Sequence, residues 1–297
     1  MKQVGAGRKL RGAGVVVLSL AAAAGWSGAA QAGDLTGHID LVSRYYLRGQ
    51  TSTYGNSTPL GNAGADAPES DHVTPQWGAD YSHESGFYAG YWGSTINYSY
   101  RQLGDSYRNR TITDFQKNKS IENDLYAGYN GTLGDWGYSA GLTYYVYVNG
   151  TDSDAAESKL ALSYGPVTLS AQTLLQDVVW GNKGDTYWTA VYTRALPYQL
   201  SFTATLGFYT YRKQGKYNGT EDTLSGTACG AGEAFIVNGC YAGKTPVGSA
   251  FRHLTLGLTQ PIADTGLTWG AQFIVGGRNR FDVKQDNRAV VSLSYGF

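Results

Sequence analysis

Histidine is the side chain most often used for proton transfer near neutral pH, and this chain has only four, at positions 38, 72, 83 and 253. Nucleophilic catalysis requires a serine within hydrogen-bond reach of a histidine that a carboxylate or amide orients. On alternating β-strands His38 and His253 would face one interior from opposite ends, whereas His72 and His83 fall in connections. No shared catalytic centre, and hence no catalytic residue, is predicted.

Two acidic pairs are the next candidates for chemistry. Glu122 and Asp124 are two residues apart, so on a strand both carboxyl groups project from one face. There they could act as an acid–base pair or bind Ca²⁺. Further ligands at suitable spacing do not accompany them, so neither a metal site nor a cofactor is predicted. Asp152 and Asp154 are typical of a solvated loop.

Residues 1–32 have the organisation of a cleaved signal peptide. Basic residues precede an apolar stretch at 14–25, and Ala30 and Ala32 supply the small side chains that signal peptidase reads. The stretch is shorter than the roughly 20 residues that a spanning helix needs. We therefore expect export, with residues 33–297 as the mature chain.

The two cysteines, Cys229 and Cys240, both lie in a long polar loop at 212–250. In an exported protein this arrangement favours a disulfide bond between them. By the chain-entropy estimate it would contribute about 3 kcal/mol to stability.

The composition favours β structure with tight turns. The chain has 41 Gly and 24 Tyr but only 1 Met, and its 23 basic residues balance its 23 acidic ones. A net charge of zero argues against nucleic acid as the main partner.

Apolar and polar residues alternate with a period of two, most cleanly at 35–50, where one face is apolar and the other polar. The same reading predicts twelve strands, at 35–50, 76–82, 87–96, 121–130, 136–148, 157–164, 167–176, 187–193, 200–211, 252–260, 267–276 and 288–297.

The connections between these strands alternate in length without exception. The short ones are 83–86, 131–135, 165–166, 195–199 and 261–266, and the long ones are 51–75, 97–120, 149–156, 177–186, 211–251 and 278–287. Short turns on one side and long loops on the other are typical of bacterial outer-membrane barrels. The predicted fold is thus an all-β, transmembrane antiparallel β-barrel of about twelve strands, with short periplasmic turns and long extracellular loops.

Aromatic residues on the apolar parity gather beside the short turns and the C-terminus. We expect Tyr81, Phe87, Tyr129, Trp136, Tyr164, Trp269, Tyr295 and Phe297 to form a girdle at the lipid interface. A second girdle, near the long loops, would contain Tyr45, Trp77, Tyr144, Tyr187 and Phe208.

The opposite parity carries charges of both signs into the interior. The pore-lining candidates are Asp40, Arg44, Arg48, Asp80, Glu122, Asp124, Glu157, Lys159 and Arg288. Such charges can select solutes in a water-filled pore, and the acidic residues near the long loops favour cations or zwitterions at the mouth. Alternatively, the arginines pair with carboxylates and plug a narrow barrel.

Four segments in order carry a resemblance: SRYYLRGQT at 43–51, DYSHESGFYAGYWGS at 80–94, IENDLYAGYNG at 121–131 and GLTYYVY at 141–147. In these segments the chain resembles the TorF family of porin-like proteins, the Gcw_chp domain family, from about residue 35 to the end. The long cysteine-bearing loop departs from that pattern. The resemblance implies an outer-membrane location and a pore, and it supplies no catalytic residue.

The expected function is a porin-like channel for passive diffusion of small hydrophilic solutes, and not an enzyme. The alternatives are a barrel enzyme, either a lipase or a lipid A-modifying hydrolase, and a surface receptor or adhesin that binds through its loops. The expected partners are outer-membrane lipids, small solutes and the barrel assembly machinery. The last of these would read the final strand, 288–297, which ends on an aromatic residue.

Overall fold

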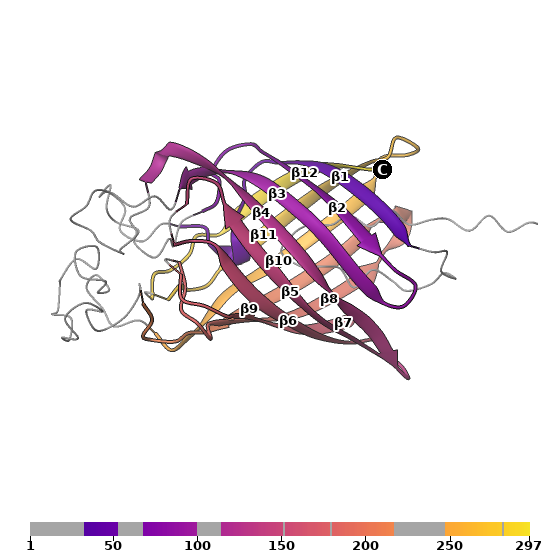
Figure 1. The fold of residues 1–297 in the computed structure, drawn as a ribbon. Coiled ribbons are helices and arrows are strands. Elements are labelled where there is room, and N and C mark those ends of the chain that lie inside the picture. Colours follow the sequence, from indigo (N-terminus) through magenta and orange to yellow (C-terminus); the bar gives the residue numbers. More distant parts are fainter. Residues whose placement is uncertain are drawn as a thin grey trace, which may run out of the picture.

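The computed structural model describes residues 33–52, 68–99, 114–150, 152–178, 180–216, 247–280 and 282–297. Twelve antiparallel strands, each paired with its neighbours in the chain, close into a barrel (Figure 1). They are β1 Asp34–Val42, β2 Thr74–Ser82, β3 Phe87–Ser99, β4 Asp114–Leu133, β5 Trp136–Tyr147, β6 Ala155–Tyr164, β7 Val167–Leu174, β8 Thr186–Ala195, β9 Ser201–Thr210, β10 Ser249–Pro261, β11 Leu267–Gly276 and β12 Arg288–Gly296. The predicted fold class is confirmed.

The barrel closes between its first and last strands. β1 pairs with β12 from His38 opposite Gly296 to Val42 opposite Ser292. Beyond that ladder, Phe297 N–H donates to Gly37 O at 2.8–2.9 Å in a reciprocal pair with Gly37 N–H and Phe297 O. The last strand is therefore not a free edge, because its backbone groups bond to β1 up to Phe297.

Alternation along the strands gives the barrel an apolar outer face. Leucines project outward from successive strands and stay largely exposed, for example Leu35, Leu142 and Leu160. Their strand neighbours on the other parity are polar or small and point inward. Exposed aliphatic side chains on every side of a closed barrel suit a bilayer, which has no water to bond a polar surface.

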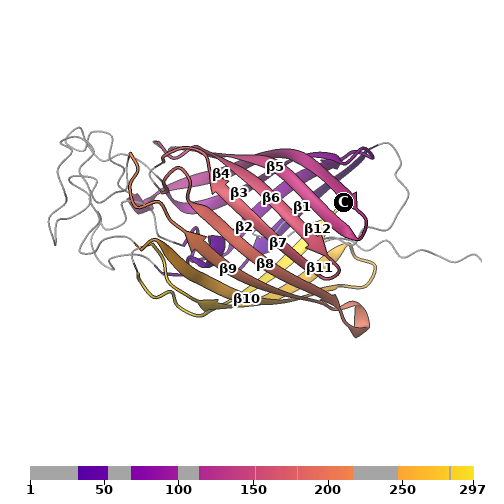
Figure 2. The ribbon, with the colours of Figure 1, turned by 90° about the horizontal axis from the view of Figure 1, so that it is seen from below.

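The two ends of the barrel differ, as Figures 1 and 2 show. At one end lie the short turns and the C-terminus, which we call the short-turn end; the other is the long-loop end. Around the short-turn end the predicted girdle side chains all project from the outer face, and seven of them, all but Trp269, are strongly exposed. Within the described residues, no helix has the length and apolarity to span a membrane.

The main difference from the predicted strands concerns the first one. β1 ends at Val42, and residues 43–52, which include the 3₁₀ turn η1 (Leu47–Gly49), leave the wall. The prediction that Arg44 and Arg48 lie on the wall of the first strand is therefore wrong. The alternating pattern continues past Val42 because an extended segment keeps period two outside a strand ladder, and Tyr45 here forms an isolated bridge with Ser70.

A second difference concerns the upper aromatic girdle. Tyr45 and Tyr187 are buried inside the barrel rather than exposed to lipid. Tyr45 lies on the segment that leaves the wall. In β8 the inward parity is that of Tyr187, Thr189 and Val191, where the sequence alternates poorly. The predicted Cys229–Cys240 bond and the signal peptide lie outside the described residues.

Candidate functional site

Residues 43–52 form a segment that folds into the long-loop half of the barrel, and we call it the inward segment. Its turn η1 packs against β10 and β11. Arg48 lies at the centre of the turn with φ 49°, a left-handed conformation that disfavours a residue with a Cβ. Strain of this kind costs about 1–3 kcal/mol and persists where surrounding contacts fix the backbone.

The Arg48 guanidinium reaches the opposite wall. It donates to both carboxylate oxygens of Glu157 on β6, at 2.9 and 2.5 Å, and to Gln172 Oε1 at 2.7 Å. It also donates to the hydroxyl groups of Tyr209 at 2.6 Å and Tyr145 at 3.2 Å. One side chain of the inward segment is thereby bonded to β5, β6, β7 and β9.

This ion pair is almost completely shielded from water. The side chains of Arg48 and Glu157 are 7% and 3% exposed, and the guanidinium lies 4.9 Å from the ring centre of Tyr187. Burial by itself lowers the pKa of Arg48, but the Glu157 carboxylate and its neighbours raise that pKa well above its ordinary value. The arginine therefore stays charged, and its pairing with Glu157 is required to keep both groups buried.

Further contacts fix the end of the inward segment. Arg252 on β10 donates from Nη2 to Gln50 Oε1. Thr51 N–H donates to Gln285 Oε1 at 2.9 Å, and its hydroxyl donates to Asp286 O at 2.7 Å. The segment is thus bonded to β10 and to the connection that precedes β12.

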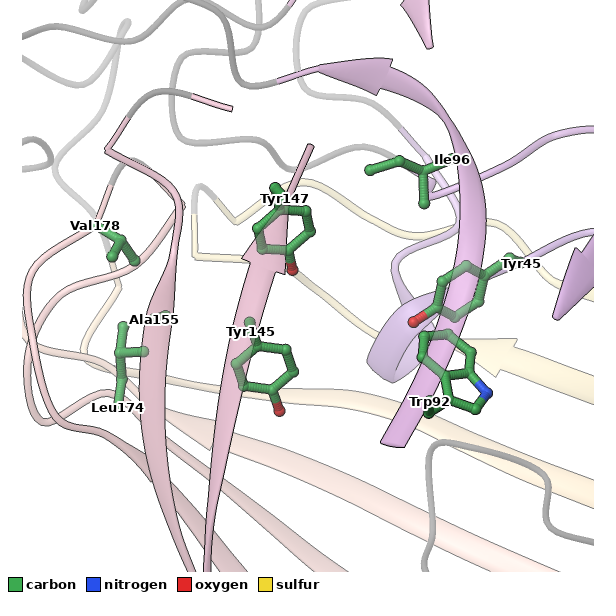
Figure 3. Packing of buried hydrophobic residues seen from close by; sticks show 8 residues of the cluster. All are labelled: Tyr45, Trp92, Ile96, Tyr145, Tyr147, Ala155, Leu174 and Val178. Carbon is green, nitrogen blue, oxygen red and sulfur yellow. The ribbon is translucent and has the colours of Figure 1, made fainter. Parts of the chain in front are cut away.

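Aromatic side chains fill the same layer of the lumen. Figure 3 shows the buried cluster, which consists of Tyr45, Trp92, Ile96, Tyr145, Tyr147, Ala155, Leu174 and Val178. Tyr45 packs edge-on against Trp92, with ring centres 5.5 Å apart and planes at 69°. Burial and the nearby Glu122 carboxyl group raise the pKa of Tyr45, so its hydroxyl remains a hydrogen-bond donor.

The short-turn half of the lumen differs in that it is lined by small hydroxyl side chains that solvent reaches. Half-buried inward residues there include Ser139, Ser163, Thr193, Thr203, Thr259 and Ser292. We call this half the vestibule. Its side chains contrast with Glu122, Glu157 and Tyr187 in the long-loop half, which are all below 4% exposed. The described lumen is therefore water-accessible on one side of the inward segment and packed around the segment itself.

The family described as "Bacterial protein of unknown function (Gcw_chp)" matches residues 26–244, which is more than half of the chain. The chain belongs to this family. The matched range contains the inward segment and every residue that bonds to the Arg48 guanidinium. A search of curated proteins found no match.

Solved structures with similar folds are membrane barrels at low identity to this Gcw_chp protein. A membrane protein crystallised in meso matches at 12% identity and a TM-score of 0.43, over 90% of this chain and 83% of its own. Salmonella typhi OmpF with daunomycin matches at 10% identity and a TM-score of 0.37, covering 89% of this chain and 97% of OmpF. Outer membrane phospholipase A from Escherichia coli matches at 12% identity and a TM-score of 0.36, covering 87% of this chain and 94% of the phospholipase.

The structure of the Gcw_chp barrel brings some of the predicted pore-lining residues together and separates others. Glu122, Asp124, Glu157 and Arg48 share the packed layer. Asp40 and Asp80 lie on β1 and β2 nearer the short turns, where Asp40 accepts from His38 at 2.7 Å and Asp80 accepts from the Tyr126 hydroxyl. Lys159 faces inward two residues from Glu157. Arg44 is exposed on the inward segment, and Arg288 pairs with Asp286 at 2.6 Å. A pore-lining role stays a prediction for each.

The sequence did not reveal several residues of the lumen. Arg252 is buried beside His253 because a bulge between Phe251 and His253 shifts the register of β10 against β9. Tyr145 and Tyr209 were not among the candidates, and Tyr187 was predicted to lie in the outer girdle, although all three contact Arg48. The only sequence signal for Tyr145 and Tyr209 is inward parity on the long-loop ends of their strands.

Gly49 allows the inward segment to pass His253, and its replacement gives a direct test. Gly49 has φ +72°, and a Cβ there would lie 2.5 Å from His253 Cβ. Gly134, in a short turn, has φ +60° with nothing within 4 Å. Gly134→Ala should cost about 1–2 kcal/mol of unfolding free energy from the backbone alone. Gly49→Ala should lose about 1–3 kcal/mol more than Gly134→Ala, because the added Cβ would overpack against His253. Urea unfolding in lipid vesicles measures both; equal losses would contradict the contact.

Proposed function

We propose that this Gcw_chp protein is an outer-membrane channel for small hydrophilic solutes, and that its inward segment controls passage. The observation that carries the proposal is the division of the lumen into a vestibule lined by hydroxyl groups and a packed layer around Arg48. Polar side chains that solvent reaches are the lining expected of a water-filled passage. The resemblance to the TorF porins supports the same function.

The inward segment is suited to control because it is held by polar contacts. Hydrogen bonds and one ion pair bind it to the wall through Arg48, Gln50 and Thr51. A passing polar solute can replace such contacts one for one, which it could not do with an apolar plug. In this proposal the described structure is the closed state.

A hydrolase is not favoured by the arrangement of the lumenal histidines. His38 Nδ1 is bonded to Asp40, whereas His253 is bonded to the Tyr187 hydroxyl at 2.7 Å and to Thr255 Oγ1 at 2.9 Å. Neither bonds to a serine among the described contacts, and they lie at different heights in the barrel. We also propose, as the pore requires, contact with outer-membrane lipids and delivery by the barrel assembly machinery through β12.

Conductance in planar bilayers tests the channel. The purified protein should give rare, small openings, because the packed layer closes most molecules at any moment. The current through each opening should fall in hydrophilic polymers small enough to enter the lumen and should not fall in polymers too large to enter it. Removal of divalent ions should have no effect. A protein that shows a folded band shift on gels yet never conducts, with the inward segment intact or released, would exclude the proposal.

A further inference from the structure

Four buried polar atoms without a hydrogen-bond partner gather on the inner face of β1–β4. They are His38 Nε2, Trp92 Nε1, Glu122 Oε2 and Asp124 Oδ1. His38 pairs across the sheet with Gly78, Gly78 with Trp92, and Trp92 with Asp124, so three of the four lie in one row. Buried polar groups are normally bonded, so these four atoms, which have no partner within the protein, are available to a polar ligand.

The residues that carry these unpartnered groups are neighbours across the strands. Trp92 is 0% exposed and directly opposite Asp124, at a separation where paired side chains touch. Gly78 leaves a gap between Trp92 and His38, and a Cβ at Gly78 would lie 2.3 Å from His38 Nε2. The imidazole therefore lies over the glycine, on the side of the row that leads to Trp92.

The wall that carries the row is strongly acidic. Asp40, Asp80, Glu122 and Asp124 all face inward from β1, β2 and β4, while no lysine or arginine does so among the described side chains of β1–β4. Arg48, whose charge acts on Asp124, is itself held by Glu157 on the far wall. The carboxyl groups of this wall therefore outnumber the basic groups near them, which are His38 beside Asp40 and the more distant Arg48, and the row can attract a cation.

The chemistry of the row favours an organic cation over a metal ion. Within the described part of the chain, no group of three or more His, Cys, Asp or Glu side chains is placed to hold a metal. Two aromatic rings, Trp92 and Tyr45, border the carboxylates and suit an ammonium with its attached carbons. The indole N–H requires an acceptor, which a metal ion lacks.

We propose that the β1–β4 wall binds a small organic ammonium ion that also carries a hydrogen-bond acceptor, such as an amino alcohol. Its N–H groups bond to Glu122 Oε2 and Asp124 Oδ1, its acceptor receives the Trp92 indole N–H, and His38 Nε2 bounds the far side. The inference rests on the proposed function only in taking this ion as a representative of the solutes that the channel conducts.

Calorimetric titration of the purified protein in detergent with ethanolammonium tests the site without requiring conduction. We expect one ion per chain, with glycerol and acetate binding far more weakly. Combining Glu122→Gln with Asp124→Asn should weaken binding by about tenfold or more, since two charged hydrogen bonds are lost. Trp92→Phe should weaken it severalfold.

Matched controls lie outside the lumen. Trp188→Phe removes an exposed, outward indole, and Glu84→Gln neutralises an exposed turn carboxylate; neither should change the affinity. No binding by the wild type, equal binding of glycerol, or an affinity unchanged by the wall variants would overturn the site and leave ordered water as its occupant. Binding without conductance would support the cation site and contradict the channel. Conductance without binding would support the channel and contradict the cation site.

Discussion

Replacing Arg48 by methionine is expected to lower the free energy of unfolding of the barrel by about 3–5 kcal/mol, because Glu157 is left buried without a countercharge. The pair is bidentate and nearly dry, so water cannot replace the guanidinium at either oxygen. Urea unfolding in lipid vesicles, followed by tryptophan fluorescence, measures the loss.

The double variant Arg48→Met with Glu157→Met separates the ion pair from packing. Because it leaves no buried charge, it should recover most of the lost stability, as buried pairs replaced by apolar residues often do. Arg44→Met is the matched control, since Arg44 is exposed on the same segment and, among the described residues, its side chain is bonded only to Tyr46, at 3.3 Å. A loss at Arg44 as large as at Arg48 would show that the segment, rather than the pair, is responsible.

Release of the inward segment is expected to raise the single-channel conductance severalfold. Combining Arg48→Ala, Gln50→Ala, Thr51→Ala and Gln285→Ala removes the bonds to Glu157 on β6 and to Arg252 Nη2. It also removes the bonds that the Thr51 hydroxyl and the Thr51 and Ser52 N–H groups make to Asp286 and Gln285 before β12. The segment then has no bond to the far wall, and the vestibule opens to the long-loop end. Planar-bilayer recording measures the change, with Arg44→Ala as the control that should keep the wild-type conductance.

The converse experiment locks the segment. Ser52 Oγ accepts from Asp286 N–H at 3.1 Å, so cysteines at positions 52 and 286 can form a crosslink across this contact. In a background with Cys229→Ser and Cys240→Ser, oxidation should abolish conductance and a reductant should restore it. Unchanged currents after crosslinking, together with unchanged currents in the released variant, would remove the inward segment from control of the channel.

The barrel could be predicted from the sequence because its determinants are local. Alternation such as that of Trp136–Tyr147 and the regular change of short and long connections need only neighbouring residues, and all twelve strands follow from them. Some strand ends differ from the predicted ones. β4 begins at Asp114, before the residue where alternation is recognisable, because a strand beyond the apolar band needs no apolar face.

The lumen could be predicted only in part because its contacts are not local. Arg48 was recognised as an inward charge, but its partner Glu157 lies 109 residues away and no pattern in the chain pairs them. Arg252 was missed because a single bulged residue reverses the parity on which the prediction depends. The acidic wall was visible as Glu122 and Asp124, whereas the unpartnered indole of Trp92 required the register of β3.

The bonds between Thr51 and Gln285 join residues 234 positions apart, and this separation orders the events of assembly. Thr51 can find Gln285 only after the final hairpin has been made and β12 has met β1. Contacts between residues so far apart in the sequence are the slowest to form, because the loop that they close contains almost the whole chain. The bond of Arg48 to Glu157 spans only 109 positions, so the inward segment can bind the β6 wall before its end is fixed beside β12.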